Sequence, residues 1–228
     1  MTLAHKHPKT ILKNISIKLK INLAILLAGF ALLLPNMAMA KDAFGLNATQ
    51  VTKVKKAQNY LNKMTTLKAK FIQATSRGGF ARGKLWISVP GRMRFDYDPP
   101  IEVIIVSNGK TVLFKDEALD QLSYIAFDAT PASMLLGGKV DFFGPNVLLT
   151  DFENDDGTVR ITVVREEDPA EGSLTMVFNA SSMALIKWMI IDAQGIATTV
   201  SLLEPRFGAK IDAKLFKVEQ RILKNNPD

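Results

Sequence analysis

From residue 66 onward, the sequence consists of short stretches in which apolar and polar residues alternate, separated by turn residues. The clearest stretch is RMRFDY at residues 92–97, where Met93, Phe95 and Tyr97 alternate with charged residues. Because successive side chains of a strand point to opposite faces of a sheet, this period of two indicates half-buried β-strands. The dipeptide Asn108-Gly109 between two such stretches favours a tight hairpin, which joins antiparallel neighbours. The chain is therefore predicted to be mainly β, with its strands paired in an antiparallel sheet.

About ten consecutive strands are predicted, and one helix precedes them. Residues 137–157 are predicted to be irregular, and a last short strand is expected near residues 215–218. So many short strands have to curl into a barrel or a sandwich. No repeat or low-complexity linker separates a second domain, so residues 41–228 are expected to form a single domain. The helix is expected at residues 49–64, with Thr49 as its cap and one face formed by Val51, Val54, Ala57, Leu61 and Met64.

The first forty residues have the pattern of a secretory signal peptide. Five lysines and no acidic residue precede an apolar segment, Ile21–Leu34, that only Asn22 interrupts, and Ala38-Met39-Ala40 then supplies the small residues of a cleavage site. The apolar segment is shorter than the roughly 20 residues that a membrane-spanning helix needs. We therefore expect residues 1–40 to be removed on export, which leaves Lys41 as the first residue.

Removal of this segment changes the charge of the protein. The full chain has 29 basic and 22 acidic residues and a net charge of +7; the five lysines of the segment leave 24 against 22, a net charge of +2. Without a basic block, nucleic acid is not an expected partner. The chain has no cysteine, which excludes disulfides and a lipid-modified N-terminal cysteine. An exported protein without an anchor is expected to be a soluble secreted or periplasmic protein.

The residues available for chemistry argue against an enzyme. The two histidines, His5 and His7, lie in the signal segment, so the remaining chain has neither His nor Cys for nucleophilic catalysis or a zinc site. The acidic stretch Asp151–Gly157 resembles a calcium loop, but its glycine is seventh instead of sixth and its twelfth position is Thr162 instead of glutamate. A solvated turn is the better interpretation. No catalytic residue, metal or cofactor is expected, although a pair of carboxylates could still hydrolyse a substrate.

Residues 128–139, DATPASMLLGGK, contain a short uncharged helix pattern. Thr130-Pro131 is typical of a helix start and Gly137-Gly138 of a helix end, which leaves about one and a half turns around Met134, Leu135 and Leu136. A helix this short is not stable alone. It could cover the mouth of a cavity for an apolar ligand inside the curled sheet. The alternative is that the apolar residues simply fill a core and the helix is an ordinary connector.

Five segments resemble the outer-membrane lipoprotein carrier (LolA) family in order and spacing. The similarity extends from about residue 49 to about residue 219, and the combination of G-x-L-W, a P-G turn, S-N-G-K-T, T-P-x-x-x-L-L and D-x-Q-G is what identifies it. The segments are LKAKFIQ (67–73), ARGKLWISVPGRMRFDYDPPIEVIIVSNGKTVLFKD (81–116), DATPASMLLGG (128–138), DAQGIATTVSL (192–202) and IDAKLF (211–216).

This resemblance implies a fold and a function. The fold would be an incomplete antiparallel β-barrel of about ten or eleven strands, with the N-terminal helix and a short lid helix covering its concave face. The protein would be a periplasmic chaperone, expected to be a monomer, that binds lipoprotein acyl chains. It would receive them from an inner-membrane ABC transporter and deliver them to an outer-membrane receptor or to the outer membrane itself. Two alternatives are a periplasmic shuttle for another lipid or glycolipid, and a lipid sensor of the same fold.

The alternation of the strands, read on this fold, predicts the binding residues. The hinges of the lid are expected at Thr130, Pro131, Gly137 and Gly138. Many family members carry an arginine before the proline of the P-G turn, which is thought to hydrogen-bond the lid, and here this position is Val89. The lid is therefore expected to be held by apolar contacts alone, the alternative being a latch from Arg92 or Arg94 of the next strand, both of which are expected to face outward. The predicted lipid-binding residues are Leu85, Ile87, Met93, Phe95, Tyr97, Ile105, Met134, Leu135, Leu136, Met176 and Trp188.

Overall fold

The eleven strands of the computed structural model, which describes residues 45–218, form one antiparallel sheet in the order β6-β5-β4-β3-β2-β1-β11-β10-β9-β8-β7. Strands that are consecutive in the chain are neighbours in the sheet except for β6 and β7, which form its two edges, and β1 pairs with β11 in the middle of the sheet. The strands are β1 (Thr66–Thr75), β2 (Phe80–Ser88), β3 (Arg92–Tyr97), β4 (Val103–Asn108), β5 (Thr111–Asp116), β6 (Gln121–Ala126), β7 (Val147–Asp155), β8 (Thr158–Arg165), β9 (Gly172–Asn179), β10 (Leu185–Asp192) and β11 (Ala197–Phe207).

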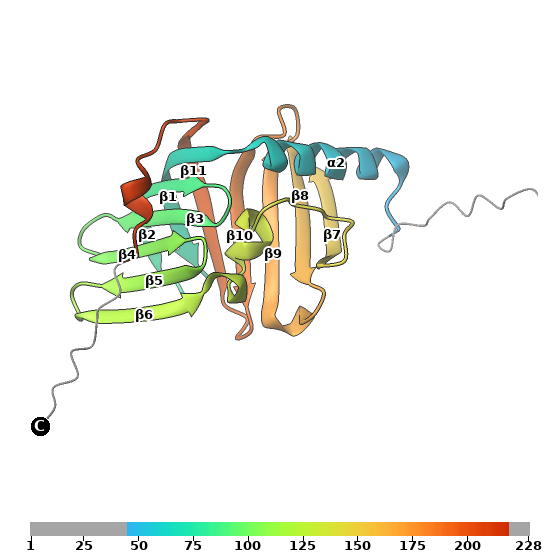
Figure 1. Cartoon of the computed structure of the whole chain (residues 1–228). Helices are drawn as coiled ribbons and strands as arrows, with labels where there is room; N and C mark the ends of the chain where they lie inside the picture. Colours follow the sequence, from blue (N-terminus) through green and yellow to red (C-terminus); the bar gives the residue numbers. More distant parts are fainter. Residues whose placement is uncertain (1–44, 219–228) are drawn as a thin grey trace, which may run out of the picture. The chain divides into compact units, whose positions relative to one another are not determined.

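The sheet is open, because within the described residues β6 and β7 each pair with only one strand. The chain passes from one edge to the other through residues 127–146, which contain the 3₁₀ turn η1 (Phe127–Ala129) and the short helix α3 (Ala132–Leu136). Figure 1 shows the two arms of the sheet, β1–β6 and β7–β11, with this connection between them. The prediction of an incomplete antiparallel barrel with two helices is confirmed. The gap between β6 and β7 is called the seam below.

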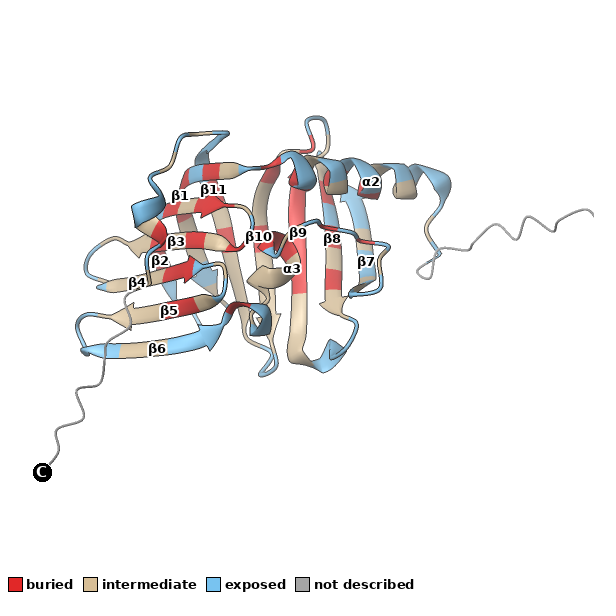
Figure 2. Cartoon of the chain, viewed as in Figure 1, coloured by how far each residue is buried: buried red, intermediate tan, exposed pale blue. Residues whose placement is uncertain are grey.

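The core lies on the concave face, where the alternation of the sequence places it. In β1 the buried residues are Leu67, Ala69 and Phe71, and the lysines between them are exposed. The register β1–β2–β3 carries this face across the arm, since Ala69 pairs with Leu85 and Leu85 with Phe95. Figure 2 shows buried positions in the middle strands of both arms. Burying side chains of this size stabilises the fold by about 1.5–3 kcal/mol each.

The N-terminal helix α2 (Ala48–Lys63) packs on the same core through Val54, Ala57 and Leu61. Its cap is Asn47, whose side chain accepts a hydrogen bond from the backbone N–H of Gln50, while the Gln50 side chain accepts one from the Asn47 N–H. The predicted cap at Thr49 is therefore wrong by two residues. The reciprocal arrangement satisfies two N–H groups at once, which Thr49 does not do.

Strand β7 lies within residues 137–157, which were predicted to be irregular. Its partly buried side chains are Val147, Leu149 and Phe152, and the spacing changes because the register shifts between Leu149 and Asp151. This bulge interrupts the period of two, and most other positions of the strand are exposed. The acidic stretch Asp151–Gly157 is thus the end of an edge strand and its turn, with Asp156 at φ 43° and Gly157 at φ 76°.

The strand predicted near residues 215–218 is also wrong. Residues Ala213–Phe216 form a 3₁₀ turn, η3, which begins where the Asp212 carboxylate accepts a hydrogen bond from the Lys214 N–H. Only Phe216 in this turn is buried. Local side-chain capping therefore competes successfully with strand pairing at the end of the chain.

Candidate lipid-binding cavity

An apolar cavity of about 210 Å³ lies between the concave face of the sheet and α3. Strands of both arms contribute to it, and the lid contributes Leu135 and Leu136. Its strand lining consists of Gln73, Ile87, Met93, Phe95, Tyr97, Ile105, Leu174, Trp188, Ile190, Thr198 and Val200.

Aromatic rings hold the wall of the cavity together. The rings of Phe71 and Phe95 meet edge to face with centroids 5.2 Å apart, and Phe95 meets Trp188 in the same way at 6.5 Å. Because Phe95 belongs to β3 and Trp188 to β10, this contact connects the two arms across the inside of the sheet. Such pairs add about 0.5–1.5 kcal/mol each to the burial of the rings. These ring contacts therefore hold the wall of the cavity in one arrangement.

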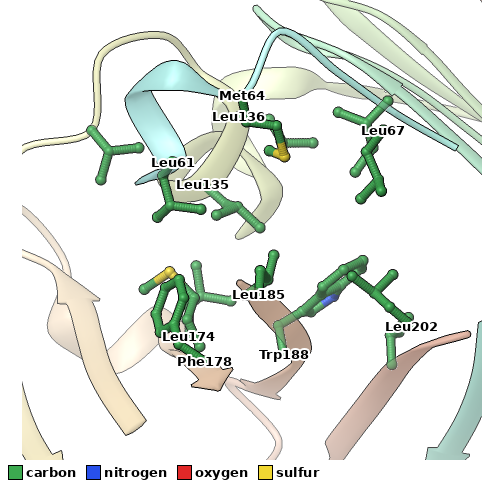
Figure 3. Packing of buried hydrophobic residues seen from close by; sticks show 14 of the residues in the cluster. Leu61, Met64, Leu67, Leu135, Leu136, Leu174, Phe178, Leu185, Trp188 and Leu202 are labelled. Atoms are coloured by element: carbon green, nitrogen blue, oxygen red, sulfur yellow. The ribbon is translucent and has the colours of Figure 1, made fainter. Parts of the chain in front are cut away.

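The lid turns its two leucines inward. Leu135 and Leu136 are 5 % and 2 % exposed, and Figure 3 shows them across from Leu174 and Trp188. Met134 instead lines a separate, polar cleft of about 700 Å³ on the other side of α3, together with Lys139, Arg165 and several acidic residues. That cleft is larger, but charged groups would lose hydration against a hydrocarbon chain, so the smaller cavity is the better lipid site.

Polar contacts fasten the lid to both arms of the sheet. On one side, the backbone N–H of Gly91 donates a hydrogen bond of 2.7 Å to the Leu136 carbonyl. Gly91 has φ 68°, and a Cβ there would come within 2.7 Å of the Gly109 backbone, so only glycine fits this turn. On the other side, the Arg165 guanidinium lies 3.4 Å from the Thr130 carbonyl oxygen and 3.4 Å from the Ser133 hydroxyl.

The expectation that apolar contacts alone hold the lid is therefore wrong. Val89 is partly buried against the core, and its backbone N–H donates to Thr65. Arg165 ends β8 at an inward position, two residues after the buried Val163, and its Nε is held by Glu171 at 2.8 Å. An arginine contacts the lid in this protein too, but from the opposite arm of the sheet.

The beginning of the lid also differs from its predicted form. The helix starts after Pro131, and no side chain caps it. The Thr130 hydroxyl does not cap the helix; it donates a hydrogen bond of 2.7 Å to the Phe127 carbonyl at the end of the preceding 3₁₀ turn. The predicted end is correct, since the helix stops at Leu136 and Gly138 has φ 143°, a conformation that favours glycine.

Comparison with known proteins assigns the family. The profile of the family described as "Outer membrane lipoprotein carrier protein LolA" matches residues 62–219 of the chain, which is more than half of its length. The chain belongs to the LolA family.

Individual relatives agree with this assignment. The outer-membrane lipoprotein carrier protein of Pseudomonas aeruginosa is 27% identical over 188 residues, which cover 78% of this chain and 89% of the relative. That of Nitrosomonas europaea is 35% identical over 95 residues, or 38% of this chain and 46% of the relative. Among solved structures, a LolA superfamily protein of Nitrosomonas europaea has a TM-score of 0.44 at 10% identity and covers 74% of this chain and 97% of its own.

As a member of the LolA family, the protein is a carrier and not an enzyme. In the part of the chain that the structure describes, no group of three or more His, Cys, Asp or Glu side chains could hold a metal ion. Within residues 45–218, no helix has the length and apolar character needed to cross a membrane.

Eight of the eleven predicted lipid-binding residues line this LolA-family cavity. They are Ile87, Met93, Phe95, Tyr97, Ile105, Leu135, Leu136 and Trp188. Leu85 and Met176 also face inward but are fully buried and do not line the cavity, and Met134 lines the polar cleft. Of the predicted hinges, Thr130 and Pro131 touch the cavity, whereas Gly137 and Gly138 border the cleft. Lipid binding by these residues stays a prediction.

The prediction missed several lining residues of the second arm. Leu174, Ile190, Thr198 and Val200 contribute to the cavity, and Val200 pairs with both Trp188 and Gln73 in neighbouring strands. The alternation in β11 contains this signal, since Thr198, Val200 and Leu202 share one face. The sequence does not show which of the inward residues lie beside the lid and which lie farther along the strand.

Proposed function

We propose that the protein is a periplasmic carrier that shelters the acyl chains of lipoproteins in the cavity beneath α3. It would receive its cargo from an inner-membrane ABC transporter and deliver it to an outer-membrane receptor or to the outer membrane directly. The observation that carries this proposal is the apolar cavity closed by Leu135 and Leu136, in a chain of the LolA family. The transporter and the receptor come from the family resemblance alone.

The energetics of the cargo require direct handover. An acyl chain of about 15 methylenes gains roughly 12 kcal/mol by burial, at ~0.8 kcal/mol for each group. Release of such a chain into water would be very slow. The lid therefore has to open toward a partner that offers another apolar site. The seam between β6 and β7 is suited to this step, because opening there breaks no strand pair.

Export is the second part of the proposal. Residues 1–40 lie outside the described residues, and their basic, apolar and Ala-x-Ala sections are the support for a cleaved signal. Intact mass and N-terminal sequencing of the protein from the periplasm are expected to show Lys41 as the first residue. A protein retained in membranes with residues 21–34 present would overturn this part.

Ile105 and Ile104 offer a matched test of the cavity. They are neighbours in β4, both are partly buried, and only Ile105 lines the cavity, since successive residues of a strand point to opposite faces. Ile105→Asp is expected to abolish binding of a diacylated lipopeptide in native mass spectrometry, while Ile104→Asp retains it. Thermal unfolding of both variants confirms that they fold. Equal binding by both would place the cargo elsewhere.

The identity of the natural cargo has its own test. The protein isolated from periplasm under native conditions is expected to carry the mass of a lipoprotein. A bound glycolipid or free phospholipid would instead support the alternative shuttle.

A further inference from the structure

A second apolar cavity, of about 270 Å³, lies on the same concave face near the end of the first arm. Its lining includes Ala81 of β2, Val103 of β4 and Phe114 of β5, and it reaches the loop residue Ile101. Phe80, which is 65 % exposed, stands at its mouth. The two cavities are named here the lid chamber, with Leu135 and Leu136, and the distal chamber, with Ala81 and Val103.

The two chambers are adjacent along the strands. Val103 and Ile105 are successive inward residues of β4, and the first lines the distal chamber while the second lines the lid chamber. Gln73 and Tyr97 line both chambers. These two residues therefore form the boundary between them.

The boundary is a single polar pair in apolar surroundings. The Tyr97 hydroxyl donates a hydrogen bond of 2.7 Å to Gln73 Oε1, and the Tyr97 ring meets Phe71 edge to face at 5.2 Å. Burial raises the pKa of the Tyr97 phenol above its usual value. Because the Tyr97 hydroxyl and the Gln73 carbonyl oxygen are bonded to each other, a hydrocarbon chain can lie against the carbon atoms of both side chains without breaking this hydrogen bond.

The lid chamber is too small for a whole acyl chain. A cavity of about 150 Å³ holds one benzene molecule, so a chamber of about 210 Å³ corresponds to roughly eight carbons. Lipoprotein acyl chains have about twice as many methylenes. The distal chamber more than doubles the available volume, and the exposed Phe80 ring at its mouth would gain from apolar cover.

We infer that the distal chamber is a second acyl subsite, which binds the methyl-terminal half of a chain whose first half occupies the lid chamber. The chain passes the Gln73–Tyr97 pair between the two. This inference rests on the proposed function. It adds a chain-length limit to the site: short chains need the lid chamber only, and long chains need both.

Val103→Trp tests this inference by filling the distal chamber, and Ile104→Trp is the matched control on the opposite face of β4. The probes are lipopeptides with acyl chains of about eight and about sixteen carbons, and losing two buried methylenes corresponds to about tenfold in affinity. Val103→Trp is expected to weaken binding of the long chain at least about tenfold and to leave the short chain unchanged. Ile104→Trp is expected to change neither. Equal effects of Val103→Trp on both lengths, or none, would overturn the inference.

A photoreactive group at the methyl end of the long chain tests the wild-type protein, in case Val103→Trp does not fold. Crosslinks are expected on Phe80, Ile101 or Phe114 of the distal chamber. Crosslinks confined to Leu174, Ile190 or Trp188 would show that the chain end stays under the lid, and the inference would then be wrong. If the wild type binds neither length, it is the proposed function that fails.

Discussion

The guanidinium of Arg165 is 3.4 Å from the Thr130 carbonyl oxygen and equally far from the Ser133 hydroxyl, so a charged side chain of β8 holds the first turn of the lid. Its Nε is fixed by Glu171, which directs the remaining nitrogens toward the lid. Across the seam, Gly91 holds the last turn through its backbone N–H. The lid is thus hydrogen-bonded to both arms of the sheet.

Removing the side chain of Arg165 is expected to loosen the empty lid. Its two hydrogen bonds are long and partly exposed, so we assign them about 1 kcal/mol together, or about fivefold in opening. Arg165→Leu is expected to speed amide exchange of residues 132–138 by about this factor. Arg160→Leu is the control, because Arg160 lies in the same strand and pairs with Glu153 on the surface. Unchanged exchange in Arg165→Leu would mean that the lid does not depend on this contact.

An arginine at position 89 is expected to add a side-chain hydrogen bond between the lid and the arm β1–β6. Val89 donates no side-chain hydrogen bond, whereas an arginine there could bond lid carbonyls at about 1.5–3 kcal/mol for each charge-assisted bond. Val89→Arg alone should slow exchange of the empty lid and make lipopeptide loading harder. In the Arg165→Leu background, the same change should bring protection back toward the wild-type value. Additive loosening in the double variant would show that position 89 does not reach the lid.

The two faces of α3 are expected to respond differently to charge. Leu135 is buried in the cavity wall, and its neighbour Met134 faces the polar cleft. Leu135→Asp should lower lipopeptide binding at least about tenfold, since a buried carboxylate without a partner is costly. Met134→Asp should bind nearly as well as the wild type. Titration of a fluorescent lipopeptide measures both, and a larger loss in Met134→Asp would reverse the assigned faces.

Asn47, and not Thr49, is expected to control the stability of α2. Asn47→Ala should lower the free energy of unfolding by about 1 kcal/mol, because it removes the side-chain oxygen that accepts a hydrogen bond from the Gln50 N–H. Thr49→Ala should change it by no more than about 0.5 kcal/mol. Urea unfolding followed by circular dichroism compares the two, and a larger loss in Thr49→Ala would contradict the assigned cap.

The sequence predicts a strand well where its alternation is unbroken. RMRFDY is β3 from its first residue to its last, because each inward side chain is apolar and each outward one charged. Strand β7 was missed because its bulge changes the spacing of the partly buried apolar residues. The step from Val147 to Leu149 is two residues, whereas the step from Leu149 to Phe152 is three. The short stretch after Asp212 was misread because a side-chain cap decides its conformation.

Local sequence patterns are also insufficient for the candidate site, because they do not contain the packing between distant strands. Alternation correctly gives the face of Leu85 and Met176, but both are fully buried, which depends on the tertiary packing over them. Arg165 follows Val159, Ile161 and Val163 on the inward face of β8, so its position was readable. That it meets the lid depends on the path of residues 127–146 between distant strands, which local patterns do not contain.

The seam gives the protein two separate mechanical responses. Every strand of the sheet keeps its neighbours when β6 and β7 move apart, and only the strap of residues 127–146 spans the space between them. Separation of these edges is therefore opposed by the contacts of the strap and by packing between the arms, such as the Phe95–Trp188 contact. The force needed to unfold the sheet is set by the hydrogen bonds between all of its neighbouring strands.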